Sequence, residues 1–195
     1  MTATEEREIS DLHFEIQVWI RYFDMRRAFF SKLFLFHNTY IGVMMSLALI
    51  GIGMKDPVLT TASLFSALII HLLSFIYGTR TSVLSGWAGA ASFYDNARLR
   101  FYDLKELWHQ EQFELVQKKK ENFLMHQNFL LRDAYNKATW ALAFNETCVA
   151  QGLPEKYRLT SWQKMRAHHS IFMRKAHIEI ASPVTAIPDI QPIWF

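Results

Sequence analysis

Two long stretches without a charged side chain dominate the hydrophobic pattern of the chain. They cover residues 33–54 and 58–79, and only Lys55, Asp56 and Pro57 separate them. A helix rises about 1.5 Å per residue, so about 20 residues cross the hydrocarbon core of a bilayer. The pattern predicts a transmembrane hairpin, in which Pro57 begins the second helix because a first turn needs no N–H donor there.

A soluble alternative is a buried helical hairpin inside a globular bundle. Both helices are apolar nearly all round, so the rest of the 195-residue chain would have to enclose them completely. Hydroxyl side chains dilute the second stretch, which lowers its hydrophobicity without adding charge. The length of both stretches favours the membrane interpretation.

Small and hydroxyl-bearing residues within the stretches suggest how the two helices approach each other. We expect Gly42, Ser46 and Gly53 to face the serines of the second stretch, because such residues let membrane helices pack closely. The same residue types suit assembly into a homo-oligomer. The intramembrane polar or pore-lining candidates are His37, Asn38, Ser63, Ser66, His71 and Ser74.

The two histidines are the most unusual members of this set. In an antiparallel hairpin that turns near Asp56, His71 lies roughly opposite Ile41, about one helical turn from His37. Ionisable groups inside a membrane are costly and often functional. A neutral histidine can instead serve as a structural hydrogen-bond partner of Ser or Thr, so a structural role and a pore- or proton-related role both stay open.

The polar-apolar pattern before the first stretch predicts an amphipathic juxtamembrane helix within residues 1–32. Its apolar positions recur every three or four residues, from Ile9 to Phe23. The helix either lies on the membrane surface or packs on the later helices. Arg26 and Arg27 follow its aromatic residues, where a helix would meet the lipid headgroups.

After the second stretch, aromatic residues recur every seven positions. This spacing predicts a coiled-coil-like seam that serves helix packing or oligomerisation. A further helical pattern covers 112–150 and ends at Gly152 and Pro154, and a basic helix follows from 161 to 180, capped by Thr160 or Ser161. The seam and the apolar C-terminal end, which we expect to dock on this chain or a neighbour, contain Trp87, Tyr94, Phe101, Leu104, Trp108, Trp194 and Phe195.

These patterns together predict an all-α protein with a transmembrane helical hairpin and long amphipathic cytoplasmic helices. Its expected parts are the juxtamembrane helix (1–32), the hairpin (33–79), a cytoplasmic helical hairpin (80–152), and a basic helix with an extended proline-containing tail (153–195). Lys and Arg flank the outer ends of the hairpin, whereas its loop has only Lys55. We therefore expect a multi-pass protein of the inner membrane with both termini in the cytoplasm.

Composition and motifs narrow the function classes. The net charge of +3 permits contact with anionic lipid, but we expect no nucleic-acid partner because the charge is not concentrated on one basic face. The single Cys148 excludes an internal disulfide and is expected to be a small buried residue. The sequence lacks a phosphate loop and the common hydrolase and zinc-protease motifs. We therefore expect no enzymatic activity, no cofactor and no metal site.

The order of the expected elements is an amphipathic helix, two spans with a tight turn, and a long helix that starts directly from the second span. In that long helix, residues 93–108 read "FYDNARLRFYDLKELW". This order and this segment resemble the SLATT superfamily of two-transmembrane proteins in bacterial conflict systems, and the resemblance covers about residues 10–115. It implies a membrane effector that assembles and permeabilises the membrane when a partner protein detects infection.

Two functions follow from these observations. The first is an oligomeric effector of a defence-type system that permeabilises or perturbs the membrane. The alternative is a non-catalytic, membrane-anchored subunit of a larger secretion, conjugation or respiratory complex. In that alternative, the exposed aromatic seam and the C-terminal tail bind partner proteins.

Overall fold

The computed structural model describes residues 3–80, 86–134, 136–169 and 178–180, and these residues are mostly helical. This confirms the expected all-α class; the described residues add one pair of two-residue strands. The chain forms two compact units. We call Met1–Arg26 with Tyr94–Phe195 the helical unit, and Arg27–Phe93 the hairpin unit. The N-terminal residues therefore pack with helices that follow the hairpin, rather than forming a unit of their own.

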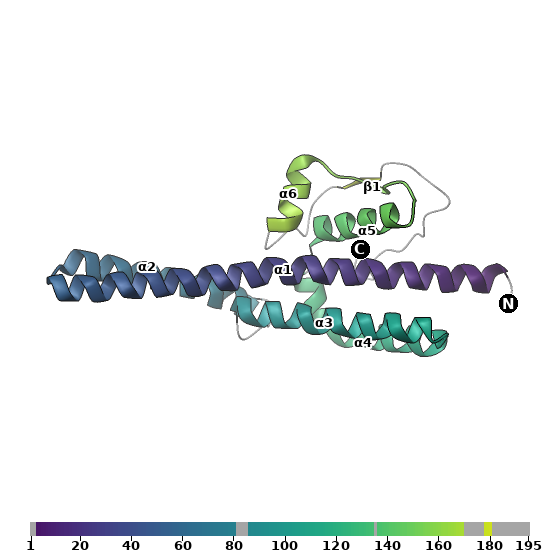
Figure 1. Ribbon diagram of the computed structural model, residues 1–195, viewed down its shortest axis with the longest axis horizontal. Helices are drawn as coiled ribbons and strands as arrows, with labels where there is room; N and C mark the ends of the chain where they lie inside the picture. The colour runs from purple at the N-terminus through teal and green to yellow at the C-terminus, as the bar shows by residue number, and fades with distance from the viewer. Residues whose placement is uncertain (1–2, 81–85, 135, 170–177, 181–195) are drawn as a thin grey trace. The chain divides into compact units, whose positions relative to one another are not determined.

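Helix α1 (Ala3–Met54) runs without a break through the predicted juxtamembrane helix and the first apolar stretch (Figure 1). No proline or glycine occurs between Ala3 and Ile41, so no strong helix breaker interrupts this part of the chain. Glu5 and Glu6 lie in the first turn, where carboxylates interact favourably with the helix dipole. The change from amphipathic to apolar sequence at residue 32 thus changes the surface of one helix and does not end it.

The predicted tight turn is confirmed. α1 ends at Met54 and α2 (Pro57–Arg80) begins at the proline. Lys55 adopts a positive φ of 54°, and the Asp56 carboxylate accepts hydrogen bonds of 3.0 Å from the N–H groups of Val58 and Leu59. Asp56 thereby satisfies two of the N–H groups that a helix start leaves without a partner.

Close helix packing next to this turn depends on Gly51. A Cβ atom at Gly51 would lie 2.5 Å from Oγ1 of Thr60 and 2.9 Å from its backbone nitrogen. Ala48, one turn earlier on α1, is buried together with Ser63 and Ala67 of α2. Small residues on both helices therefore permit the contact, as sequence composition predicted, although the residues of α1 that do so are different ones.

The outer surface of the hairpin is apolar. α1 and α2 each contain a segment that is long and apolar enough to cross a membrane, and only 6% and 11% of these segments are buried. Exposed Leu, Ile, Val, Met and Phe side chains cover both helices. The soluble alternative requires the rest of the chain to enclose the hairpin, and the described residues do not enclose it.

Helix α3 (Gly86–His109) does not continue α2. Gly86 lies against Ser74, which precedes the last turns of α2, and a Cβ atom at Gly86 would come within 2.6 Å of the Ser74 hydroxyl. The positive φ of 62° at Gly86 is a conformation that glycine adopts without strain. The expectation of a long helix that starts directly from the second span is therefore wrong.

In the helical unit, the later helices pack around the N-terminal part of α1. α3 and α4 (Phe113–Ala134) lie on one side of α1, and α5 (Lys137–Ala150) and α6 (Ser161–His169) lie on the other (Figure 1). Aromatic contacts hold α1 to both sides. The ring centroids of Trp19 and Trp140 are 4.5 Å apart, and those of Phe23 and Phe101 are 5.3 Å apart. The predicted amphipathic helix thus buries its apolar face against the later helices.

Two helix predictions in this unit need correction. The segment 112–150 forms two helices, because the Asn136 side chain caps α5 by accepting a hydrogen bond of 3.1 Å from the N–H of Thr139. The predicted last helix does not reach residue 180, since β2 (Glu179–Ile180) pairs antiparallel with β1 (Tyr157–Arg158). Of the two predicted caps of α6, the structure selects Thr160. Its Oγ1 accepts a hydrogen bond of 3.2 Å from the N–H of Gln163.

Candidate functional site

Three rings form a cluster in the hairpin unit. The ring of His37 in α1 lies 5.6 Å from the ring of His71 in α2. It lies equally far, edge to face, from the indole of Trp87 at the start of α3. The structure therefore brings the two predicted histidines into contact. It adds Trp87, which sequence reasoning assigned to a packing seam instead.

The ring nitrogens of this cluster have few hydrogen-bond partners. Nδ1 of His37 lies 3.3 Å from Oδ1 of Asn38, a distance that suits donation from an Nδ1–H group. Nε2 of His37 and Nε1 of Trp87 are buried and make no hydrogen bond among the described residues. Buried polar atoms of this kind carry a desolvation cost, which marks the cluster as a functional candidate.

Three serines of α2 lie along the inner side of the hairpin. The hydroxyl of Ser66 forms a hydrogen bond with that of Tyr40. Ser63 is buried, and so is Ser74, whose Oγ lies 3.4 Å from the backbone nitrogen of Trp87. Ser66 and Ser74 therefore stabilise contacts within one chain. No sequence motif marked Tyr40, although its three-residue spacing from His37 places both on one side of α1.

The predicted facing of Gly42, Ser46 and Gly53 toward α2 is wrong. All three are exposed, and a Cβ atom at either glycine would meet no described atom within 4 Å. The hydroxyl of Ser46 donates to the carbonyl of Gly42 on its own helix, at 2.9 Å. The buried Ala48 lies two positions after Ser46, which corresponds to about 200° around the helix. These residues therefore face away from α2.

With Asn38, the three residues form a stripe along the exposed side of α1. Asn38, Gly42, Ser46 and Gly53 are separated by four, four and seven residues, which places them on one helical face. We call this set the outer stripe. Polar side chains and glycines occupy this stripe, whereas long apolar side chains cover most of the surrounding surface.

The aromatic seam is used within the chain. Tyr94, Phe101 and Leu104 are buried in the helical unit, where Phe101 also contacts Trp19. Trp108 stacks on His13 with ring centroids 4.0 Å apart, and its indole N–H donates to the Ile9 carbonyl at 3.3 Å. The interpretation of the seam as an exposed surface for partner proteins is therefore wrong, because α1 already covers it.

The remaining candidates add little chemistry. Cys148 is buried, as expected, and burial raises the pKa of its thiol, which disfavours the reactive thiolate. Burial likewise raises the pKa of Tyr22, with a further contribution from Tyr94. Within the described part of the chain, no three His, Cys, Asp or Glu side chains cluster as a metal site would require. Trp194 and Phe195 lie outside the described residues.

Comparison of the chain with protein-family models, with curated proteins and with solved structures found no match.

Proposed function

We propose that this protein is an integral membrane effector that oligomerises through its hairpin and permeabilises or perturbs the membrane. The outer stripe carries the proposal. An exposed apolar hairpin suits lipid, yet Asn38, Gly42, Ser46 and Gly53 interrupt that surface with polar or side-chain-free positions. In lipid, such a stripe is most stable against another helix or against water in a pore.

The ring cluster supports a second part of this proposal, which concerns the closed state of the hairpin. His37 of α1 and His71 of α2 are in ring contact with each other. A change in the hydrogen bonds of these rings alters the contact between the two helices. We propose that the cluster sets how firmly the hairpin stays closed in the resting protein.

The defence-type role rests on the resemblance to SLATT proteins in the amphipathic helix, the two spans and residues 93–108, without the direct continuation of the second span into the next helix. In this proposal a partner protein supplies the trigger, and the helical unit receives it. The anchored-subunit alternative has lost one supporting argument, since Tyr94, Phe101 and Leu104 of the aromatic seam are buried in the helical unit. It predicts harmless expression and stable co-purification with other subunits.

The outer stripe provides the experimental test. We expect expression of the native chain in bacteria to arrest growth and admit a membrane-impermeant dye. The double variant Gly42→Leu/Ser46→Leu fills the stripe with bulky apolar side chains, so it should grow normally and exclude the dye. Membrane insertion of each variant is checked by fractionation.

A matched control changes the other exposed helix. Thr61→Leu/Ala62→Leu replaces one hydroxyl-bearing and one small residue, both exposed on α2, with the same side chain. We expect this variant to remain toxic. Equal toxicity of the stripe variant and the control would contradict the proposed role of the stripe, and a harmless native chain would contradict permeabilisation itself.

A further inference from the structure

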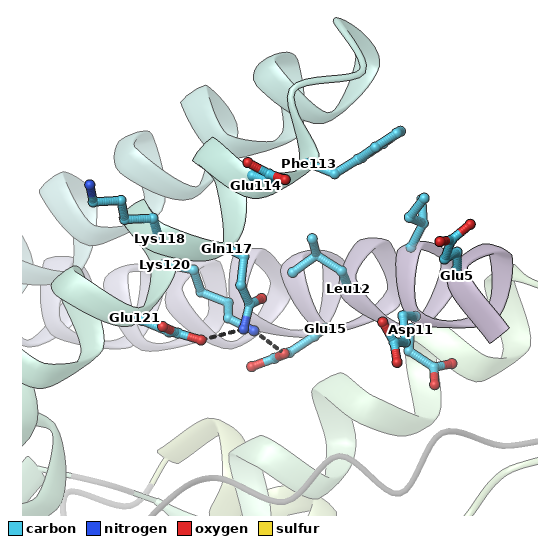
Figure 2. A pocket seen from close by; sticks show the side chains of 12 residues that line it. Glu5, Asp11, Leu12, Glu15, Phe113, Glu114, Gln117, Lys118, Lys120 and Glu121 are labelled. Carbon is cyan, nitrogen blue, oxygen red and sulfur yellow. Dashed lines mark hydrogen bonds and ion pairs between the residues drawn. The ribbon is translucent and has the colours of Figure 1, made fainter. Parts of the chain in front are cut away.

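A groove lies between the first turns of α1 and the first turns of α4, wholly within the helical unit (Figure 2). Its volume is about 830 Å³. Leu12 of α1 and Phe113 of α4 line it from facing helices, and Ile9 adds a third apolar side chain. The groove therefore offers an apolar floor outside the predicted membrane spans.

The walls of the groove are strongly acidic. Among the described residues, Lys118 and Lys120 are the only basic side chains that line it. Nζ of Lys120 lies 2.6 Å from a carboxylate oxygen of Glu15, so this ion pair neutralises one lysine and one carboxylate of the groove. The six carboxylates that line the groove belong to Glu5, Glu8, Asp11, Glu15, Glu114 and Glu121.

This combination limits what can occupy the groove. Anionic lipid headgroups and nucleic acid would be repelled by the carboxylates, and a bare cation would gain nothing from the apolar floor. A helix of about 10 Å diameter suits a cleft between two helices, with apolar anchors at positions i, i+3, i+4 and i+7. Lys and Arg beside those anchors would meet the acidic walls.

We propose that the groove is the docking site for a basic amphipathic helix of a partner protein. The apolar side of the partner helix covers Ile9, Leu12 and Phe113, and its basic residues pair with the carboxylates along both walls. The inference goes beyond the proposed function, because it concerns binding by the helical unit and does not depend on membrane permeabilisation.

A helical peptide library displayed on phage tests the proposal. The target is the full chain in nanodiscs of zwitterionic lipid, and binders to empty nanodiscs are removed first. We expect the selected peptides to be enriched in Lys and Arg and to carry apolar residues with helical spacing. Selected peptides that lack the Lys and Arg enrichment, or that lack the helical spacing of apolar residues, would overturn the proposal.

Charge variants then locate the binding site of a selected synthetic peptide. Glu8→Lys/Glu114→Lys reverses two exposed groove charges and should raise the Kd at least about tenfold, because like charges then face each other. The matched control Glu106→Lys/Glu155→Lys changes two exposed carboxylates that do not line the groove. Equal Kd values for both variants would overturn the proposal.

Two further variants separate docking from non-specific attraction and from misfolding. Phe113→Ala removes part of the apolar floor without changing charge and should also weaken binding. An unchanged Kd would show that charge alone holds the peptide, which contradicts a docked helix. Lys118→Glu makes the groove more acidic and should tighten binding, a gain that a misfolded variant would not produce.

Discussion

Arg26 shows how strongly the environment of a single residue can differ from its expected one. Its position after an aromatic cluster suggested contact with lipid headgroups, yet the side chain is fully buried. The guanidinium lies over the ring of Tyr94, 5.6 Å from the ring centroid. A desolvated cation over an aromatic face is stabilised by the negative potential of the ring. Arg26 therefore joins α1 to α3 within the helical unit.

His13 is a second residue whose properties come from packing. Its ring stacks on Trp108 and lies 6.0 Å from the ring of His109. The side-chain amide of Gln17 lies 3.1 Å from Nε2, a distance that suits donation to a neutral ring. Burial, followed by the charges of His109 and Lys105, lowers the pKa of His13 below its ordinary value of 6.5.

We predict that His13 makes the protein less stable in mild acid. A histidine whose pKa falls on folding binds fewer protons in the folded state than in the unfolded state. The neutral His13 ring contributes its full stability above about pH 6.5. This contribution is lost as the pH falls toward the lowered pKa, because the unfolded chain then binds a proton that the folded chain does not. The variant His13→Gln should therefore show a shallower loss of thermal stability between about pH 7.5 and pH 5.5.

The control for this prediction is His126→Gln, which makes the same substitution at an exposed histidine of α4. Thermal unfolding of the three proteins in one detergent, followed by circular dichroism, provides the measurement. If His13→Gln and the native chain lose stability in parallel, the pH dependence originates elsewhere.

At the scale of elements, the contact between α1 and α2 depends on which glycine faces the partner helix. We predict that Gly51→Ala destabilises the hairpin by about 1–3 kcal/mol, because the added methyl group overpacks a tight contact with the backbone of Thr60. Gly53→Ala adds the same group two residues later, where no described atom lies within 4 Å.

The free energy of unfolding in mixed micelles, measured with increasing denaturing detergent, distinguishes the two variants. We expect Gly53→Ala to equal or slightly exceed the native stability, because alanine is the better helix former. A larger loss for Gly53→Ala than for Gly51→Ala would mean that the helices pack through the opposite face of α1.

At the scale of the whole molecule, the exposed surface of the hairpin determines how the protein behaves in solution. Long apolar side chains from both helices are exposed along the two segments that can span a membrane. Exposed apolar area costs about 25 cal/mol per Å² in water, so these helices are far more stable in lipid or detergent.

We predict that the chain partitions into the membrane fraction and resists extraction by carbonate or high salt. Detergent should release it, and removal of the detergent should cause aggregation. A compact, monodisperse particle in detergent-free buffer, measured by light scattering, would contradict the membrane assignment and the function proposed from it.

The sequence by itself determined the features that depend on neighbours along the chain. The tight turn at Lys55–Pro57 and the apolar helices follow from local backbone chemistry and from the length of uncharged segments. The same local signals limited the cap of α6 to Thr160 or Ser161. Helical periodicity also predicted that Tyr94 and Phe101 share one packing face. It could not tell whether that face meets another copy or α1 of the same chain.

Only the tertiary structure decided which faces meet. The phase of α1 at its contact with α2 turns Gly51 inward and Gly42 outward, although both are glycines in the same apolar helix. The return of the chain at Gly86 brings Trp87 to His37, across 50 residues of sequence. The acidic groove likewise forms because α4 lies along the first turns of α1. Residue type and spacing define possible contacts, but rotation about each helix axis and packing between distant segments select among them.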